Sequence, residues 1–298
     1  SFGAKCVFAS DINKDAQIIY KKNFGIQPFG DITKIAAQDI PPHDILCAGF
    51  PCQPFSISGN QQGFEDEQGR GRLFFNIIDI IHEHHPKMVL LENVKNLEKH
   101  DGGNTLLRIR TELQNEGYCV FHSVLCAADY NVPQARQRIY IVAFRNDLGV
   151  QEFPFPTELN EYATLDSILI QDGDNEIQGK YYIDREYTLG ILNPESSKKL
   201  IRIGQIGLGR QGERIYSIKG LASTLSSQGG GLGGKTGMYL INGRVRKLYP
   251  RECARLMGFP DSFILAQTQE RCYNQFGNSV VVNVLQYIIN QTQNIWEG

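Results

Sequence analysis

A cysteine set between two prolines is the residue of this sequence best suited to chemistry. Cys52 lies in the stretch GFPCQPFS, where an apolar run ends and a Ser/Gly-rich stretch begins. Pro51 and Pro54 restrict the backbone on both sides, so they present the side chain in one direction. A nucleophilic thiol needs such a fixed aim and a cationic neighbour that lowers its pKa. Taken alone, a free cysteine is more often a small core residue.

Further polar groups lie beside strand-like segments and could meet this thiol. Glu92 ends the apolar run KMVLLEN. Arg136 and Arg138 alternate onto one side of an extended segment, QARQR, that leads into another strand. Ligands of parallel sheets bind outside the carboxyl ends of the strands, so we expect Cys52 and Glu92 to meet there. The alternatives are a helix-capping glutamate and two surface arginines.

The elements that must position these residues alternate between strand-like and helix-like runs. We predict strands at 4–10, 44–50, 87–93 and 138–145, and helices at 14–24, 73–85 and 104–116. Alternating units of this length predict an α/β fold: a Rossmann-like, mostly parallel sheet with helices on both faces.

The second half of the chain has a different character. From 151 to about 250 the segments are short and rich in Gly, Pro, Asn and Ser, which indicates a smaller domain of strands and loops; helical patterns return after 250. Basic residues gather in 198–219 and 235–255. Such a basic face is compatible with phosphate contacts, and a solvated face is the alternative.

Composition excludes several classes of protein. The chain has 298 residues, 41% hydrophobic and 21% charged, with a net charge of −2. It contains neither an apolar run long enough for a membrane span nor a secretory signal at its start, SFGAKCVFASD. Seven cysteines without a CxxC pair favour reduced thiols in a cytosol over a disulfide framework or a zinc site.

Three stretches resemble ligand-binding motifs, but the residues around them do not fit those motifs. GLGRQG at 207–212 matches a dinucleotide fingerprint, but a strand-like segment follows where a helix is required. QGGGLGGKTG at 228–237 lacks the spacing of a phosphate loop, and HEHH at 82–85 is not a metal-binding HExxH. We interpret the first two as loops and the third as the polar end of a helix, so no metal is expected.

Four motifs occur in a fixed order along the chain: GFPCQPFS (49–56), ENV (92–94), QARQR (134–138) and QFGNSV (275–280). The set resembles that of the DNA (cytosine-5)-methyltransferases over nearly the whole chain, and most resembles the Hha-type enzymes of bacterial restriction–modification systems. The resemblance implies a catalytic domain at 1–166 and 277–298, a target-recognition domain at 167–249 and a hinge at 250–276. It also implies double-stranded DNA as partner, a bacterial cytosolic location and an intact enzyme that is monomeric.

The resemblance implies a mechanism for the residues at the strand ends. The cytosine leaves the duplex, and the Cys52 thiolate adds to its ring carbon 6. Carbon 5 then takes a methyl group from S-adenosyl-L-methionine. Glu92 contacts ring N3 and the exocyclic amine, which requires a pKa raised above the ordinary value of about 4.3 if it is to donate a proton near pH 7. Arg138 holds the carbonyl oxygen of the base, and Arg136 supports the cavity and a nearby phosphate.

The resemblance also assigns binding roles. The cofactor would be held by Asp11, Ile12, Asp31, Ile32, Pro51, Leu73, Asn278 and Val280. DNA would be contacted by Gln53, Ser56, Ser58, Gln211 and Arg214. The stretch 56–72, SISGNQQGFEDEQGRGR, resembles the family's mobile loop that closes over DNA.

The chain departs from the family pattern at identifiable places. It has no Phe-x-Gly-x-Gly-Gly loop, which in the family lies against the cofactor. We therefore expect weak cofactor binding and poor activity from this chain alone, with the loop lost by truncation or renumbering, or supplied by a partner chain. Gln228 stands where Hha-type enzymes have an aromatic residue, which argues against assigning their GCGC target. Two alternatives remain open: the tRNA-methylating branch of the family, and a non-enzymatic DNA-binding subunit or inactive fragment.

Overall fold

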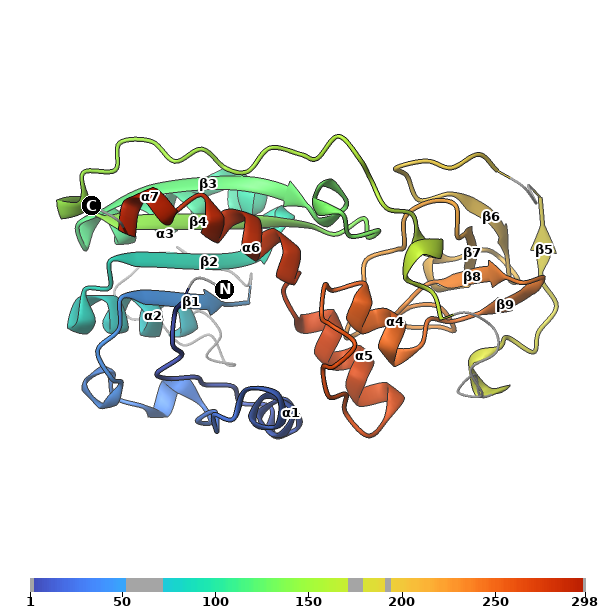
Figure 1. Ribbon diagram of the computed structural model, residues 1–298, viewed down its shortest axis with the longest axis horizontal. Helices are drawn as coiled ribbons and strands as arrows, with labels where there is room; N and C mark the ends of the chain where they lie inside the picture. Colours follow the sequence, from blue (N-terminus) through green and yellow to red (C-terminus); the bar gives the residue numbers. More distant parts are fainter. Residues whose placement is uncertain (1–2, 52–71, 171–178, 191–193, 297–298) are drawn as a thin grey trace. The chain divides into compact units, whose positions relative to one another are not determined.

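The computed structural model describes residues 3–51, 72–170, 179–190 and 194–296 (Figure 1). The chain forms two compact units. The first unit comprises Ser1–Leu125, Gln137–Phe155 and Ile289–Gly298, and the second unit comprises Cys126–Arg136 and Pro156–Ile288. No helix of the described residues is both long enough and apolar enough to cross a membrane.

The first unit is built on a four-stranded sheet. Its strands are β1 (Ile45–Gly49), β2 (Met88–Val94), β3 (Tyr118–Cys126) and β4 (Gln137–Arg145), in the order β1-β2-β4-β3. Strands β1 and β2 are parallel, whereas β2 and β4 are antiparallel. The expected α/β class is confirmed. Within the described residues the sheet is mixed, because β2 pairs in parallel with β1 and antiparallel with β4.

Local signals determine the helices of the first unit, which are α1 (Lys14–Phe24), α2 (Arg72–His84) and α3 (Asn104–Asn115). The side chain of Asn13 accepts the first free N–H groups of α1, and Gly25 ends it in the left-handed conformation at φ 74°. Helix α2 buries Phe74 and Ile81 in the core beneath the sheet. The three predicted helices of this unit are confirmed within a few residues at each end.

Two strand predictions for this unit were incomplete. Residues 4–10 form no strand; a single parallel bridge joins Ser10 to Phe29, with the N–H of Phe29 donating to the carbonyl of Ala9 at 2.8 Å. Strand β3 was missed, because its side chains are mostly half-buried and do not alternate cleanly between apolar and polar.

The second unit contains a five-stranded sheet and helices near its C-terminal end. The strands are β5 (Thr188–Leu189), β6 (Arg202–Gln205), β7 (Arg214–Ser217), β8 (Met238–Ile241) and β9 (Arg244–Arg246), paired in that order. The later helices are α4 (Pro250–Arg255), α5 (Gln269–Asn278), α6 (Val282–Asn290) and α7 (Gln293–Trp296), of which the residues from Ile289 belong to the first unit. The expected short strands and the return of helices after 250 are confirmed.

A buried ion pair joins strand β9 to helix α4. The guanidinium of Arg246 binds both carboxylate oxygens of Glu252 at 2.7 Å, and the two side chains are 1% and 0% exposed. The carboxylate also accepts the N–H groups of Tyr249 (2.8 Å) and Ile170 (3.1 Å). Each buried charge is therefore compensated by the other. The free-energy cost of removing them from water is offset only while both partners are present.

Replacing Glu252 with Gln is expected to lower the free energy of unfolding by about 3 kcal/mol, because the Arg246 charge stays buried without a counter-charge. Urea denaturation measures this loss. The control is Asp261→Asn, which breaks a similarly bidentate pair with Arg255 whose aspartate side chain is 61% exposed. That variant should lose less than about 1 kcal/mol. Equal losses in the two variants would contradict the conclusion that burial makes the Arg246–Glu252 pair important for stability.

Candidate active site

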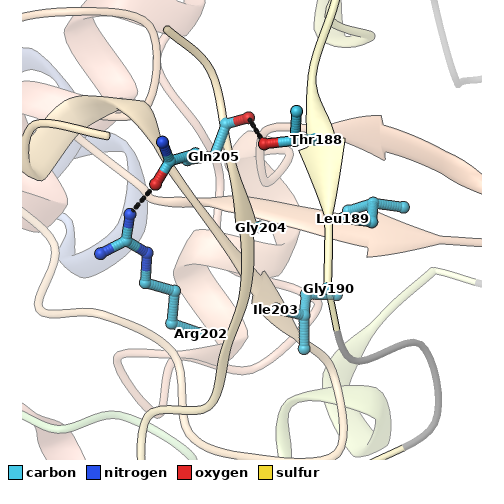
Figure 2. Close-up of a pocket in the computed structure, with 7 residues that line it drawn as sticks. All are labelled: Thr188, Leu189, Gly190, Arg202, Ile203, Gly204 and Gln205. Atoms are coloured by element: carbon cyan, nitrogen blue, oxygen red, sulfur yellow. Dashed lines mark hydrogen bonds between the residues drawn. The ribbon is translucent and has the colours of Figure 1, made fainter. Parts of the chain in front are cut away.

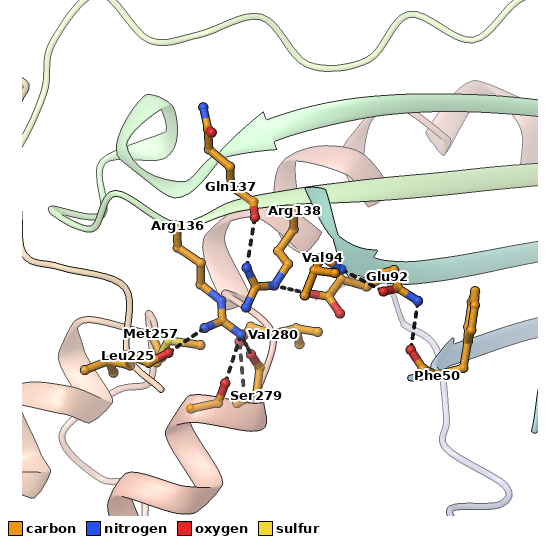
Figure 3. A network of polar contacts seen from close by, with 12 residues as sticks. Phe50, Glu92, Val94, Arg136, Gln137, Arg138, Leu225, Met257, Ser279 and Val280 are labelled. Carbon is orange, nitrogen blue, oxygen red and sulfur yellow. Dashed lines mark hydrogen bonds and ion pairs between the residues drawn. The ribbon is translucent and has the colours of Figure 1, made fainter. Parts of the chain in front are cut away.

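The parallel strands β1 and β2 bring two motifs of the sequence together. In their register Gly49 lies opposite Glu92, so no side chain of β1 occupies the position facing this carboxylate. The next residue, Asn93, is 4% exposed, and its side-chain amide donates at 2.8 Å to the carbonyl of Phe50, which is labelled in Figure 3. The chain is thus held beside the end of β2 as far as Phe50, and Pro51 follows with its side chain exposed.

An ion pair sits at the end of β2. The Nε of Arg138 lies 3.0 Å from Oε1 of Glu92, and the two side chains are 16% and 17% exposed. Antiparallel pairing of β2 with β4 places Arg138 opposite Val94, which brings the guanidinium alongside the carboxylate. Its Nη1 also donates to the carbonyl of Gln137 at 2.9 Å. The arrangement presents a carboxylate and a fixed cation together in a partly desolvated position.

Arg136 has a different environment, within the second unit. It is 3% exposed and donates to three backbone carbonyls: Leu225 (3.2 Å), Gly277 (3.2 Å) and Ser279 (2.7 Å). Asn278 and Val280, two of the expected cofactor residues, belong to the segment that these bonds fix. The contacts of Arg136 therefore position a neighbouring segment.

Gln134 is a buried residue that joins distant segments of the second unit and that the sequence did not single out. Its side chain is fully buried, donates to the carbonyl of Leu256 at 2.8 Å and accepts the N–H of Leu225 at 3.0 Å. A buried amide that satisfies both a donor and an acceptor from distant segments specifies their spacing. The feature of the sequence that could have identified Gln134 is its position as the first residue of the QARQR motif.

Two acidic residues expected at the cofactor lie on adjacent segments of the first unit. The bridge between Ser10 and Phe29 runs in parallel, so Asp11 and Asp31 follow the same ends of two paired segments. Asp11 accepts the N–H of Asn13 at 2.7 Å. The side-chain hydroxyl and the backbone N–H of Thr33 hold the pKa of the Asp31 carboxyl below its ordinary value. The carboxylate of Asp31 is thus ionised near neutral pH, and the side-chain oxygens of both residues are of the type that accepts hydrogen bonds from hydroxyl groups.

The apolar residues expected near the cofactor differ in exposure. Ile12 is 74% exposed beside Asp11, whereas Ile32 is half-buried at the start of a short 3₁₀ helix. Leu73 is half-buried in helix α2. A large exposed apolar side chain next to a carboxylate suits a ligand with a flat apolar ring and a sugar, so the residues of this unit fit an adenosine group.

The expected DNA-contacting residues are only partly within the described chain. Cys52, Gln53, Ser56 and Ser58 lie outside the described residues. Gln211 is exposed in a 3₁₀ turn, and Arg214 opens β7 with its Nε donating to the carbonyl of Gly209 at 3.4 Å.

A hollow of about 350 Å³ lies on strands β5 and β6 of the second unit (Figure 2). It is lined by Thr188, Leu189, Gly190, Arg202, Ile203, Gly204 and Gln205. Its one charged group, the guanidinium of Arg202, is hydrogen-bonded to the side chain of Gln205. None of these residues was expected at the site, and we assign no chemistry to the hollow.

Comparison with known proteins identifies a family for this chain. The C-5 cytosine-specific DNA methylase family model matches residues 1–294. Type II methyltransferase M.HhaI of Haemophilus parahaemolyticus is 50% identical over 291 residues, covering 97% of this chain and 87% of that protein. Type II methyltransferase M.HaeII of Haemophilus aegyptius is 42% identical over 291 residues, covering 97% and 86%.

A solved structure shows the same fold at low sequence identity. The Dnmt2 methyltransferase of S. pombe matches with a TM-score of 0.71 and 22% identity, covering 98% of this chain and 92% of that one. The expected Rossmann-like methyltransferase fold is thereby confirmed. The family match and the type II relatives support methylation of DNA cytosine at carbon 5 and do not favour the tRNA alternative. This chain belongs to the C-5 cytosine-specific DNA methylase family.

Proposed function

We propose that the protein transfers a methyl group from S-adenosyl-L-methionine to carbon 5 of a cytosine flipped out of a specific double-stranded DNA site. Its type II relatives support a role in a bacterial restriction–modification system, acting on DNA in the cytosol. The observation that carries the proposal is the Glu92–Arg138 ion pair at the end of β2, across from the end of β1 that leads to Cys52.

Glu92 and Arg138 would bind neighbouring groups on the Watson–Crick edge of the same base. The Glu92 carboxyl group would contact ring N3 and the exocyclic amine of cytosine. Arg138 uses Nε and Nη1 for the protein contacts described above, and its Nη2 has no hydrogen bond within the described residues. That nitrogen is suited to donate to the carbonyl oxygen of the base. Partial burial strengthens both interactions relative to water.

Cys52 would be the nucleophile. Its thiolate bonds to carbon 6 while a proton at N3, supplied through Glu92, offsets the charge that develops on the ring. The electron pair at carbon 5 would then take the methyl group, and the sulfonium of the cofactor would leave as a neutral thioether. A base would remove the carbon-5 proton, N3 would return its proton to Glu92, and the thiolate would leave as the ring double bond re-forms. Holding Phe50 and Pro51 beside β2 restricts the approach of the thiol to one face of the base.

S-adenosyl-L-methionine would supply the methyl group. We assign its ribose to Asp11, its adenine to the surroundings of Ile12, Asp31 and Ile32, and its remaining contacts to Pro51, Leu73, Asn278 and Val280. Arg136 would act by fixing the backbone around Asn278 and Val280.

The proposal also assigns a role to each part of the chain. Residues 1–166 and 277–298 would carry catalysis, 167–249 would read the target, and 250–276 would link them. Gln211 and Arg214, on the exposed turn before β7 and at its start, would contact bases, together with Gln53, Ser56 and Ser58.

Bisulfite sequencing of plasmid DNA from cells expressing the intact gene, so that any segment carrying the cofactor loop is included, tests the function. One short sequence motif should resist conversion at a single cytosine, and the same cells carrying the Cys52→Ala gene should show full conversion. Uniform conversion in cells that contain the folded wild-type protein would overturn the proposal. A conversion-resistant cytosine would also exclude an inert DNA-binding subunit.

A further inference from the structure

A single buried hydroxyl joins two segments of the second unit. Tyr239 in β8 is fully buried, and its hydroxyl oxygen accepts the N–H of Ser223 at 3.0 Å. The same hydroxyl donates to the carbonyl of Thr236 at 2.9 Å and lies 3.2 Å from the hydroxyl of Ser223. Burial raises the pKa of Tyr239 far above neutrality, so the hydroxyl keeps the proton that it donates.

The first segment, residues 221–227, is attached to the QARQR motif. The hydroxyl of Thr224 donates to the carbonyl of Ala135 at 2.7 Å, and the N–H of Leu225 donates to the side chain of Gln134 at 3.0 Å. These bonds hold 221–227 against the residues that precede Arg136.

The second segment, residues 228–237, is the glycine-rich loop. Its Gly233 N–H donates to the carbonyl of Gly212 at 2.9 Å, which ties the loop to the turn that carries Gln211. Close backbone contact makes this possible, since a Cβ on Gly212 of the turn would clash with the carbonyl oxygen of Gly230 of the loop. The position of the loop therefore decides the position of a proposed base-contacting turn.

The hydroxyl of Tyr239 is packed tightly against the backbone of Gly237. Gly237 adopts φ +79°, and a Cβ added there would come within 2.4 Å of the hydroxyl oxygen. One further backbone bond, from Ser226 N–H to the carbonyl of Lys235 at 3.0 Å, joins the two segments nearby. Loss of the hydroxyl leaves a donor on Ser223 and an acceptor on Thr236 unsatisfied without opening a large cavity.

We propose that the Tyr239 hydroxyl is a positioning group for target recognition: it sets the spacing of 221–227 and 228–237, and through the Gly233–Gly212 bond it sets the position of the turn bearing Gln211. The inference rests on the proposed DNA-methylating function. It goes beyond that function by naming a residue that would contact no base and yet controls the choice of site.

The matched pair Tyr239→Phe and Tyr216→Phe tests the proposal. Tyr216 lies directly opposite Tyr239 in the register of β7 and β8, is 5% exposed, and its hydroxyl makes no hydrogen bond within the described residues. In methylation assays on duplexes with the identified site, Tyr239→Phe should raise KM for DNA about tenfold with kcat within about twofold. Its preference for that site over single-base variants should fall about tenfold. Tyr216→Phe should match the wild type.

A stability measurement and amide exchange complete the test. If Tyr239→Phe lowers the melting temperature and kcat but leaves KM and site preference unchanged, the role of the hydroxyl is merely structural. That result would overturn the proposal. Amide hydrogen exchange in peptides covering 228–237 should be faster in Tyr239→Phe and unchanged in Tyr216→Phe. If the wild type methylates no DNA, the proposed function fails by itself. Exchange then still decides the positioning role, since equal exchange in the two variants overturns it.

Discussion

Replacing Cys52 with alanine is expected to lower kcat for DNA methylation on the order of 10⁴-fold or more, because no other group is proposed to bond to carbon 6 of the cytosine. Incorporation of radiolabelled methyl groups into duplex DNA measures the loss. Binding of duplex DNA, followed by gel shift, should be retained, because the thiol contributes to the reaction far more than to the complex.

Cys47→Ala is the matched control. Cys47 is a second thiol of the first unit and lies in β1, five residues before Cys52 in the sequence. No contact with the base is proposed for it, so it should not replace a missing nucleophile. With duplex DNA containing 5-fluorocytosine, the wild type and Cys47→Ala should form a covalent adduct that survives a denaturing gel, and Cys52→Ala should form none. An adduct with Cys52→Ala would remove position 52 from the mechanism.

Replacing Glu92 with glutamine is expected to lower kcat about 10²- to 10³-fold, with a smaller change in KM for DNA. The amide cannot pass a proton to ring N3, and it removes the negative partner that holds Arg138 at 3.0 Å. Single-turnover methylation under saturating DNA and cofactor measures the chemical step directly.

Glu112→Gln controls for the loss of a similar ion pair elsewhere. Glu112 pairs with Arg108 along helix α3 at 2.5 Å, and its side chain is 17% exposed, as is that of Glu92. The methylation rate of Glu112→Gln should equal that of the wild type. A comparable rate loss in both variants would indicate a general effect of charge or folding and would contradict a catalytic role for Glu92.

Local signals were sufficient to predict the helices of the first unit. Asn13 and Gly25 mark the ends of α1 through contacts within a few residues, and such contacts can be read from sequence. Strands need distant partners. Residues 4–10 have a strand-like composition and form only the bridge at Ser10, whereas β3, with its irregular burial, pairs with β4.

The residues of the candidate site could be singled out from the sequence, whereas their contacts could not. Residue types and motif order singled out Glu92, Arg136 and Arg138. The Glu92–Arg138 pair depends on the antiparallel register of β2 and β4, and the bonds of Arg136 reach carbonyls far along the chain. Neither follows from spacing, because register and loop packing are tertiary properties.

The buried pair of Arg246 and Glu252 restricts how this protein can be recombined with its relatives. A hybrid enzyme joined between β9 and α4 would combine an arginine from one parent with whatever the other parent places opposite it. If that residue were neutral, the buried arginine of the hybrid would have no counter-charge. Exchange of target specificity by grafting should therefore transfer 170–252 as one block, so that Ile170, Arg246 and Glu252 are inherited together.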